Sequence, residues 1–163
     1  MDDPEGFYKI LKKDSVFGNF QKQVAGEMLP ITLEDLHEMV KDIILNDGVP
    51  EEVSGVLETA KQLFVLGYFG YRLFTVSSHY SFLAVEAALG NKYKAIYGKK
   101  ESNLNEVINR LAKDGLIPSD KKDVYNACRR LRNQLSHLTT RKVLAPDASA
   151  LYRAAELIND LYK

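Results

Sequence analysis

The sequence predicts an all-α protein: an up-and-down bundle of four to five core helices with an N-terminal helical arm. Apolar residues recur every three or four positions over most of the chain, which is the period of an amphipathic helix. No segment shows the convincing two-residue alternation that is typical of a half-buried strand. The 163 residues suit one domain with its own core, and 45% of them are hydrophobic. We expect an arm with a short helix over residues 1–49 and the bundle over residues 50–163.

The first helical pattern follows a weakly periodic segment over residues 1–30. Thr32 suits an N-cap because Asp35 stands at the third helical position, and Asn46-Asp47-Gly48 predicts the end of this helix. Its apolar stripe consists of Leu33, Leu36, Val40, Ile43 and Ile44.

Residues 51–97 form the longest apolar helical region, and Pro50 suits its first turn. Gly67 and Gly70 either permit close packing or mark a joint between two helices. The many aromatic side chains near this point are typical of a core.

Three shorter helices are predicted after this region. Asn103 and Glu106 form a capping-box pattern at the start of the first, and Gly115 closes it. Prolines open the other two. The expected spans are 104–113, 118–138 and 146–162.

Composition narrows the classes of protein to which the chain can belong. The net charge is zero, which argues against an indiscriminate nucleic-acid coat protein. Charge is uneven, however: residues 27–58 hold nine acids against one lysine, a balance of −8, and residues 121–142 hold seven bases against one acid, a balance of +6.

We find no secretory signal or membrane span, and the single Cys128 forms no internal disulfide, so we expect a cytoplasmic protein with no membrane partner. Cys128 itself is expected to be a small buried apolar residue.

The most informative motif is Arg132-Asn133-x-x-x-His137, within the helix expected at residues 118–138. On a wheel of about 100° per residue, an apolar stripe centred on Leu131 is expected to face the core. Arg132, Asn133 and His137 then fall on a polar arc, and Arg129 and Ser136 share it. The sequence therefore predicts a catalytic set of Arg132, Asn133 and His137, with Arg129 and Ser136 binding the substrate.

These residue types suit phosphodiester chemistry. A guanidinium offers a planar fork of donors to phosphate oxygens, and an imidazole with a pKa near 6.5 can act as acid or base near neutral pH. Arg132 and His137 lie about 140° apart on the wheel, which suits embracing a phosphate or meeting a second copy of the helix. Asn133 lies between them and can orient either side chain. Two structural alternatives stay open: an ordinary solvated helix face, and a histidine that caps a helix C-terminus.

No other reaction class has comparable support in the sequence. There is no phosphate-binding P-loop, no dinucleotide-binding glycine pattern and no zinc-protease motif. Three scattered histidines and one cysteine provide no credible zinc spacing. We therefore expect neither a metal nor a cofactor.

From about residue 50 onward the chain resembles the HEPN superfamily, helical domains found in RNA-cutting toxins and antiviral proteins. Besides the motif helix, the matching stretches are Tyr71-Arg72-Leu73-Phe74, Ala84-Val85-Glu86-Ala87-Ala88-Leu89 and Lys113-Asp114-Gly115-Leu116. The resemblance implies a homodimer whose motif helices meet at a two-fold axis and build one composite RNA site. It also implies that an acidic residue on an earlier helix supports the motif, for which Glu86 is the candidate.

The first expectation for function is thus a metal-independent endoribonuclease in stress response or phage defence, with RNA as substrate and an antitoxin or regulatory protein as a further partner. The second is a non-catalytic HEPN-type module that binds RNA, nucleotide or a partner protein. The third is an unrelated helical oligomer whose basic face binds an acidic partner, with the acidic segment 27–58 as one such surface.

Overall fold

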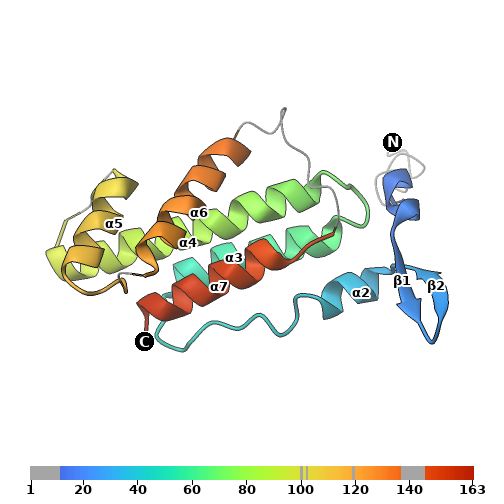
Figure 1. Ribbon diagram of the computed structural model, residues 1–163, viewed down its shortest axis with the longest axis horizontal. Coiled ribbons are helices and arrows are strands. Elements are labelled where there is room, and N and C mark those ends of the chain that lie inside the picture. Colours follow the sequence, from blue (N-terminus) through green and yellow to red (C-terminus); the bar gives the residue numbers. More distant parts are fainter. Residues whose placement is uncertain (1–11, 100, 102, 119, 137–145) are drawn as a thin grey trace, which may run out of the picture.

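The computed structural model describes residues 12–99, 101, 103–118, 120–136 and 146–163. This part of the chain folds into six α-helices, one short 3₁₀-helix and one two-stranded sheet (Figure 1). The predicted all-α class and helical bundle are confirmed. The helices are α2 (Leu33–Glu38), α3 (Glu51–Leu66), α4 (Leu73–Tyr97), α5 (Leu104–Lys113), α6 (Lys122–Leu135) and α7 (Ser149–Leu161).

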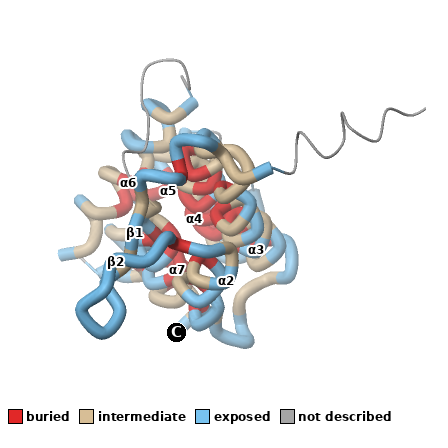
Figure 2. The backbone as a smooth tube through the Cα atoms, turned by 90° about the vertical axis from the view of Figure 1, so that its right-hand side faces the viewer, coloured by how far each residue is buried: buried red, intermediate tan, exposed pale blue. Residues whose placement is uncertain are grey.

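Helix α4 is the centre of the bundle, because α3, α5, α6 and α7 all pack on it (Figure 1). Its buried residues lie on more than one face, which is typical of a helix with neighbours on several sides. Figure 2 shows the buried residues gathered where these helices face one another. Any pair of side chains that joins α4 to another helix therefore lies at an interface between helices of the central bundle.

Helices α3 and α4 form a tight antiparallel pair, and the turn between them explains the glycines there. A Cβ atom on Gly67 would lie 2.6 Å from the ring of Phe74. Because real Cβ atoms do not approach so closely, only glycine admits the Phe74 ring at this corner. The long apolar region is thus two helices, with the joint in the region that contains Gly67 and Gly70.

The C-terminal helices begin and end close to their expected positions. Asn103 caps α5 by accepting a hydrogen bond from the Asn105 backbone, and Gly115 follows α5 with a φ of 74°, in the left-handed region. Helix α6 is tied to α7 by the Tyr125 hydroxyl, which donates to the Leu157 carbonyl at 2.7 Å. Lys121, at the start of α6, also pairs with Glu156 and Asp160 of α7.

The expectation of a helical arm was wrong in one respect, because the arm contains a β-hairpin. Strands β1 (Gln21–Val24) and β2 (Glu27–Pro30) pair antiparallel, and the two turn residues Ala25 and Gly26 have φ values of 50° and 91°. Positive φ at both central residues defines the type of tight turn that hairpins favour. Nearly every residue of both strands is exposed, so neither face required apolar side chains and no alternation marked them in the sequence.

The rest of the arm is anchored to the bundle. A 3₁₀-helix (Ser15–Asn19) buries Phe17, whose ring stacks on Phe74 at a centroid distance of 5.9 Å. The Asp14 carboxylate accepts a hydrogen bond from the Tyr71 backbone at 2.8 Å. Five residues of the arm join the core of the bundle: Phe17, Ile31, Leu36, Val40 and Ile43.

Helix α2 is shorter than the sequence pattern indicated. The capping box of Thr32 and Asp35 is present, but α2 ends at Glu38 instead of near Asn46. Beyond it the chain is held by α7, since the Asn159 side chain accepts a hydrogen bond from the Asn46 backbone at 2.8 Å and donates to the Ile44 carbonyl at 3.0 Å. The Ile44 side chain is 73% exposed and does not belong to the core stripe. Within the described residues, no helix combines the length and apolar composition needed to cross a bilayer.

Candidate functional site

Helix α6 presents a different face to the core from the one that the sequence pattern predicted. Leu131, the expected centre of the stripe, is 39% exposed, whereas Tyr125 and Cys128 are buried. On the same wheel Tyr125 and Cys128 fall at about 120° and 60°, either side of Arg132 at about 100°. The inward face of α6 is therefore rotated by roughly a quarter turn from the predicted stripe. Arg132 points toward α4, not away from the core.

Arg132 meets Glu86 of α4. Its Nε donates to the Glu86 carboxylate oxygen Oε2 at 2.7 Å, and Nη2 of the same guanidinium donates to that oxygen as well. The two side chains are 28% and 34% exposed, so the pair lies at the rim of the bundle, partly shielded from water. Glu86, the acid on an earlier helix that was expected to support the motif, therefore contacts Arg132 directly.

Asn133 completes the orientation of the guanidinium. The Asn133 side-chain oxygen Oδ1 accepts a hydrogen bond from Nη1 of Arg132 at 2.9 Å. Three of the five guanidinium N–H groups thus have partners within the described part of the chain, and two remain for a ligand. Glu86 and Asn133 hold the guanidinium plane on two edges, so the free donors point in one fixed direction. Recognition of a planar anion requires such a fixed direction.

A second imidazole lies at the same junction. Ser136, directly after α6, has its Oγ 3.2 Å from Nε2 of His79 on α4. The Ser136 hydroxyl also lies 3.1 Å from the Arg132 carbonyl, to which it can donate. His79, Glu86, Arg132 and Ser136 therefore form one cluster across the α4–α6 junction. His79 lies outside the Arg132-Asn133-x-x-x-His137 motif and is not among the residues that the sequence predicted for the site.

The environment of His79 favours its neutral form. Partial burial lowers the pKa of the imidazole below its ordinary value of 6.5, and the positive charge of Arg132 lowers the pKa further. The carboxylate of Glu86 acts in the opposite direction. The ring is therefore largely unprotonated near pH 7 and can accept a proton.

Two predicted site residues, Arg129 and His137, are not part of this cluster as the structure describes it. Arg129 lies on α6, and its Nε atom is buried with no hydrogen-bond partner within the described residues. The Arg129 side chain is thus partly drawn into the protein and is less available to a substrate than its place on the wheel suggested. His137 lies outside the described residues.

A metal-binding cluster is not found in the described residues: no three His, Cys, Asp or Glu side chains there are placed to hold one ion. Cys128 is buried, as expected, and burial raises the pKa of its thiol to about 11. It is therefore not an activated nucleophile.

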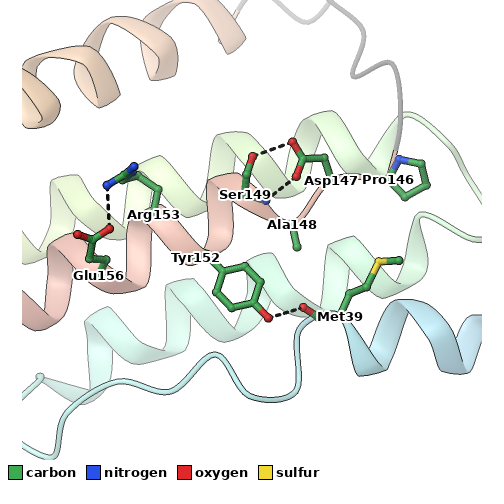
Figure 3. Close-up of a pocket in the computed structure, with 8 residues that line it drawn as sticks. All are labelled: Met39, Pro146, Asp147, Ala148, Ser149, Tyr152, Arg153 and Glu156. Atoms are coloured by element: carbon green, nitrogen blue, oxygen red, sulfur yellow. Dashed lines mark hydrogen bonds and ion pairs between the residues drawn. The ribbon is translucent and has the colours of Figure 1, made fainter.

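One of the surface hollows lies away from this cluster. It has a volume of about 790 Å³ and is bounded by Met39 and by the start of α7, Pro146–Glu156 (Figure 3). Its polar groups are paired with one another: Ser149 with Asp147, Arg153 with Glu156, and the Tyr152 hydroxyl with the Met39 carbonyl. Its lining residues include no histidine or cysteine, whereas the α4–α6 junction holds an imidazole beside an oriented guanidinium, so we place the candidate site at that junction.

Comparison with known proteins adds no relative, since no family model, curated protein or solved structure matches this chain. The assignment of the site therefore depends on its own geometry. His79 has a sequence signal in hindsight: it precedes Glu86 by seven residues, about two helical turns, so both side chains share one face of α4. The seven-residue spacing of His79 and Glu86 becomes informative only when this face of α4 is known to contact Arg132.

Proposed function

We propose that the chain is a metal-independent endoribonuclease of the HEPN type. The observation that carries the proposal is Arg132, a guanidinium oriented by Glu86 and Asn133, with two donors that no described residue accepts. It lies against α4, the helix that also carries the imidazole of His79. In the proposed reaction the ribose 2′-OH attacks the adjacent phosphorus. Arg132 stabilises the charge that develops on the phosphoryl oxygens, and His137 transfers a proton. DNA, which lacks the 2′-OH, is not a substrate.

The proposed enzyme acts as a homodimer. Leu131 supports this part of the proposal because it is an exposed leucine one residue before Arg132, on a helix of which only Tyr125 and Cys128 are buried. A second copy of α6 would cover that side chain and bring a second Arg132 close to the first. The two motif faces would then make one composite site for RNA.

The second candidate is a non-catalytic module that binds RNA or a partner protein. The Arg132–Glu86 ion pair favours it, because a guanidinium already paired with a carboxylate offers a phosphate less net charge than a free one. This candidate predicts that the protein binds RNA and leaves it intact.

The test is a cleavage assay on total RNA and on a tRNA pool, with and without EDTA. We expect cleavage in both conditions and products with a 5′-OH and a 2′,3′-cyclic phosphate. The 5′ ends would accept phosphate from a kinase without prior phosphatase treatment, and the 3′ ends would resist phosphatase until the cyclic phosphate is opened.

Arg132→Ala and His137→Ala should each slow cleavage by about a hundredfold or more, the usual cost of removing a group that stabilises a transition state. Arg110→Ala is the matched control, since Arg110 is an exposed arginine that pairs with Asp114 away from the site. Intact RNA after incubation with wild-type dimer would favour the binding module. Cleavage that EDTA abolishes would rule out the metal-independent mechanism.

A further inference from the structure

The proposed reaction needs two proton transfers, and the motif of each protomer supplies one histidine. A proton must leave the attacking 2′-OH, and another must reach the departing 5′-oxygen. We propose that His79 is the general base of this site: its ring takes the 2′-OH proton while Arg132 holds the phosphoryl oxygens. This inference rests on the proposed ribonuclease function and extends it by a residue from a different helix.

The position of His79 supports this role. His79 and Glu86 lie on one face of α4, and that face meets α6 at Arg132 and Ser136. The contact between Nε2 of His79 and Oγ of Ser136 fixes the ring beside the residue that follows the last turn of α6. An imidazole and an oriented guanidinium are thereby held at one junction, close enough for the Arg132 charge to lower the pKa of His79.

The hydrogen bonds of Ser136 decide which ring nitrogen is available. A serine hydroxyl has one hydrogen, and here it lies within reach of the Arg132 carbonyl. When the hydroxyl donates to that carbonyl, its contact with His79 must run from Nε2–H to Oγ. In this tautomer Nδ1 carries the lone pair, and no described residue donates a hydrogen bond to it. Nδ1 is then the proton acceptor.

The charges around the ring favour a base over an acid. Burial and the Arg132 charge lower the pKa of His79, while Glu86 partly opposes them, and the neighbouring Tyr80 ring contacts the imidazole edge-on at a centroid distance of 6.5 Å. The imidazole is unprotonated at neutral pH, as a base must be before it acts. His137 is left with the complementary role of acid.

The step balances with these two residues alone. The bond between the 2′-oxygen and phosphorus forms, and the bond between phosphorus and the 5′-oxygen breaks. His79 receives the 2′-OH proton, and protonated His137 gives a proton to the 5′-oxygen. The products are a 2′,3′-cyclic phosphate and a 5′-OH, after which both rings return to their starting states by proton exchange with water.

A purely structural role for His79, in which its contact with Ser136 braces α4 against α6, predicts a different outcome for one substitution. In His79→Gln the amide can keep a hydrogen bond to Ser136 but cannot carry a proton. His79→Asn is a second variant with a shorter amide, used if the glutamine variant does not fold by circular dichroism. The matched control is His37→Gln, since His37 is an exposed histidine on α2.

The experiment measures single-turnover cleavage against pH on RNA and on the same strand with sulfur in place of the bridging 5′-oxygen. Sulfur leaves without protonation, so it rescues the loss of an acid but not the loss of a base. We expect His79→Gln to cleave RNA more slowly by about a hundredfold or more, with KM changed little. The variant should also lose the increase in rate with rising pH that we expect of wild type below pH 6.5. Sulfur at the bridging position should not restore its rate. His137→Ala, in contrast, should be rescued by sulfur.

Two results would overturn the inference while the proposed function stands: a wild-type rate and pH profile in His79→Gln, or rescue of that variant by sulfur. Wild-type protein that leaves both strands intact would overturn the proposed function and this inference together. The behaviour of the wild-type protein therefore separates the two failures.

Discussion

The guanidinium of Arg132 donates through Nε to the carboxylate of Glu86 at 2.7 Å, and the two residues are 46 positions apart in the chain. This contact joins the central helix α4 to the helix that carries the motif. A partly exposed ion pair contributes only about 0–1 kcal/mol to stability. Its main consequence is therefore orientation, because it fixes the plane of the guanidinium and the direction of the donors that stay free.

Glu86→Gln should reduce RNA cleavage by about tenfold, equivalent to roughly 1.4 kcal/mol of barrier, because a neutral amide holds the guanidinium less firmly. Since the Glu86 charge raises the pKa of His79, its removal should also move the rise in rate to lower pH. Single-turnover rates against pH measure both effects. Glu58→Gln is the control, as the Glu58 side chain is exposed and forms an ion pair with Lys61 on α3. A Glu86→Gln profile that coincides with wild type would show that Glu86 orients nothing that reacts.

The pH dependence of stability should contain a contribution from His79. The folded state lowers the pKa of this ring, so below about pH 6.5 the unfolded chain binds more protons than the folded protein. The free energy of unfolding should therefore fall as the pH drops below 6.5, and the fall should be shallower in His79→Gln. Urea denaturation of both proteins at several pH values between 7.5 and 5 measures the difference. Parallel curves would mean that the environment of His79 does not disfavour its charged form.

Leu131→Glu should convert the proposed dimer into a monomer without unfolding the chain. Leu131 is already 39% exposed in the single chain, so the glutamate costs the fold little, whereas a charge buried between two copies of α6 is strongly unfavourable. Light scattering after gel filtration measures the mass, and cleavage should be lost with the dimer. Ile44→Glu is the matched control, because Ile44 is another exposed apolar residue in a different region of the protein. A Leu131→Glu variant that remains dimeric would place the interface elsewhere.

The Cys128 thiol should be inert in the folded protein. Burial raises its pKa to about 11, so at pH 8 only about one thiol in a thousand is ionised. A thiol-specific chromogenic reagent should therefore react slowly with native protein and completely in guanidinium chloride. Rapid reaction of the native protein would contradict the burial of this side chain. Cys128→Ala should retain cleavage, since the thiol has no part in the proposed chemistry.

The sequence predicted the helices well because strong local signals mark them. The capping residues Thr32 and Asn103 and the helix-closing Gly115 all lie at the expected helix ends. The hairpin at residues 21–30 was not predicted, because its exposed strands carry no alternating apolar pattern. The end of α2 was also missed, since hydrogen bonds to Asn159, more than a hundred residues away, determine where the chain goes after Glu38.

The candidate site was only partly predictable for a similar reason. Arg132 and Asn133 could be selected from the motif, and Glu86 from the family resemblance. The direction in which Arg132 points could not be predicted. Apolar periodicity assigns the inward face of α6 to Leu131, but the ion pair with Glu86 allows the charged Arg132 to face inward instead. His79 could not be selected either, as its relation to Ser136 arises from the packing of two helices.

The most direct test of the central claim compares one end-labelled RNA strand with its 2′-O-methyl counterpart, in EDTA, for wild type and Arg132→Lys. Lysine keeps the positive charge but cannot reproduce the fork that binds Glu86, Asn133 and phosphate together. We predict that wild type cuts the RNA and spares the methylated strand, and that Arg132→Lys cuts the RNA about a hundredfold more slowly. Equal cutting of both strands, or equal rates for the two proteins, would contradict the assignment of Arg132 to a ribose-phosphate linkage.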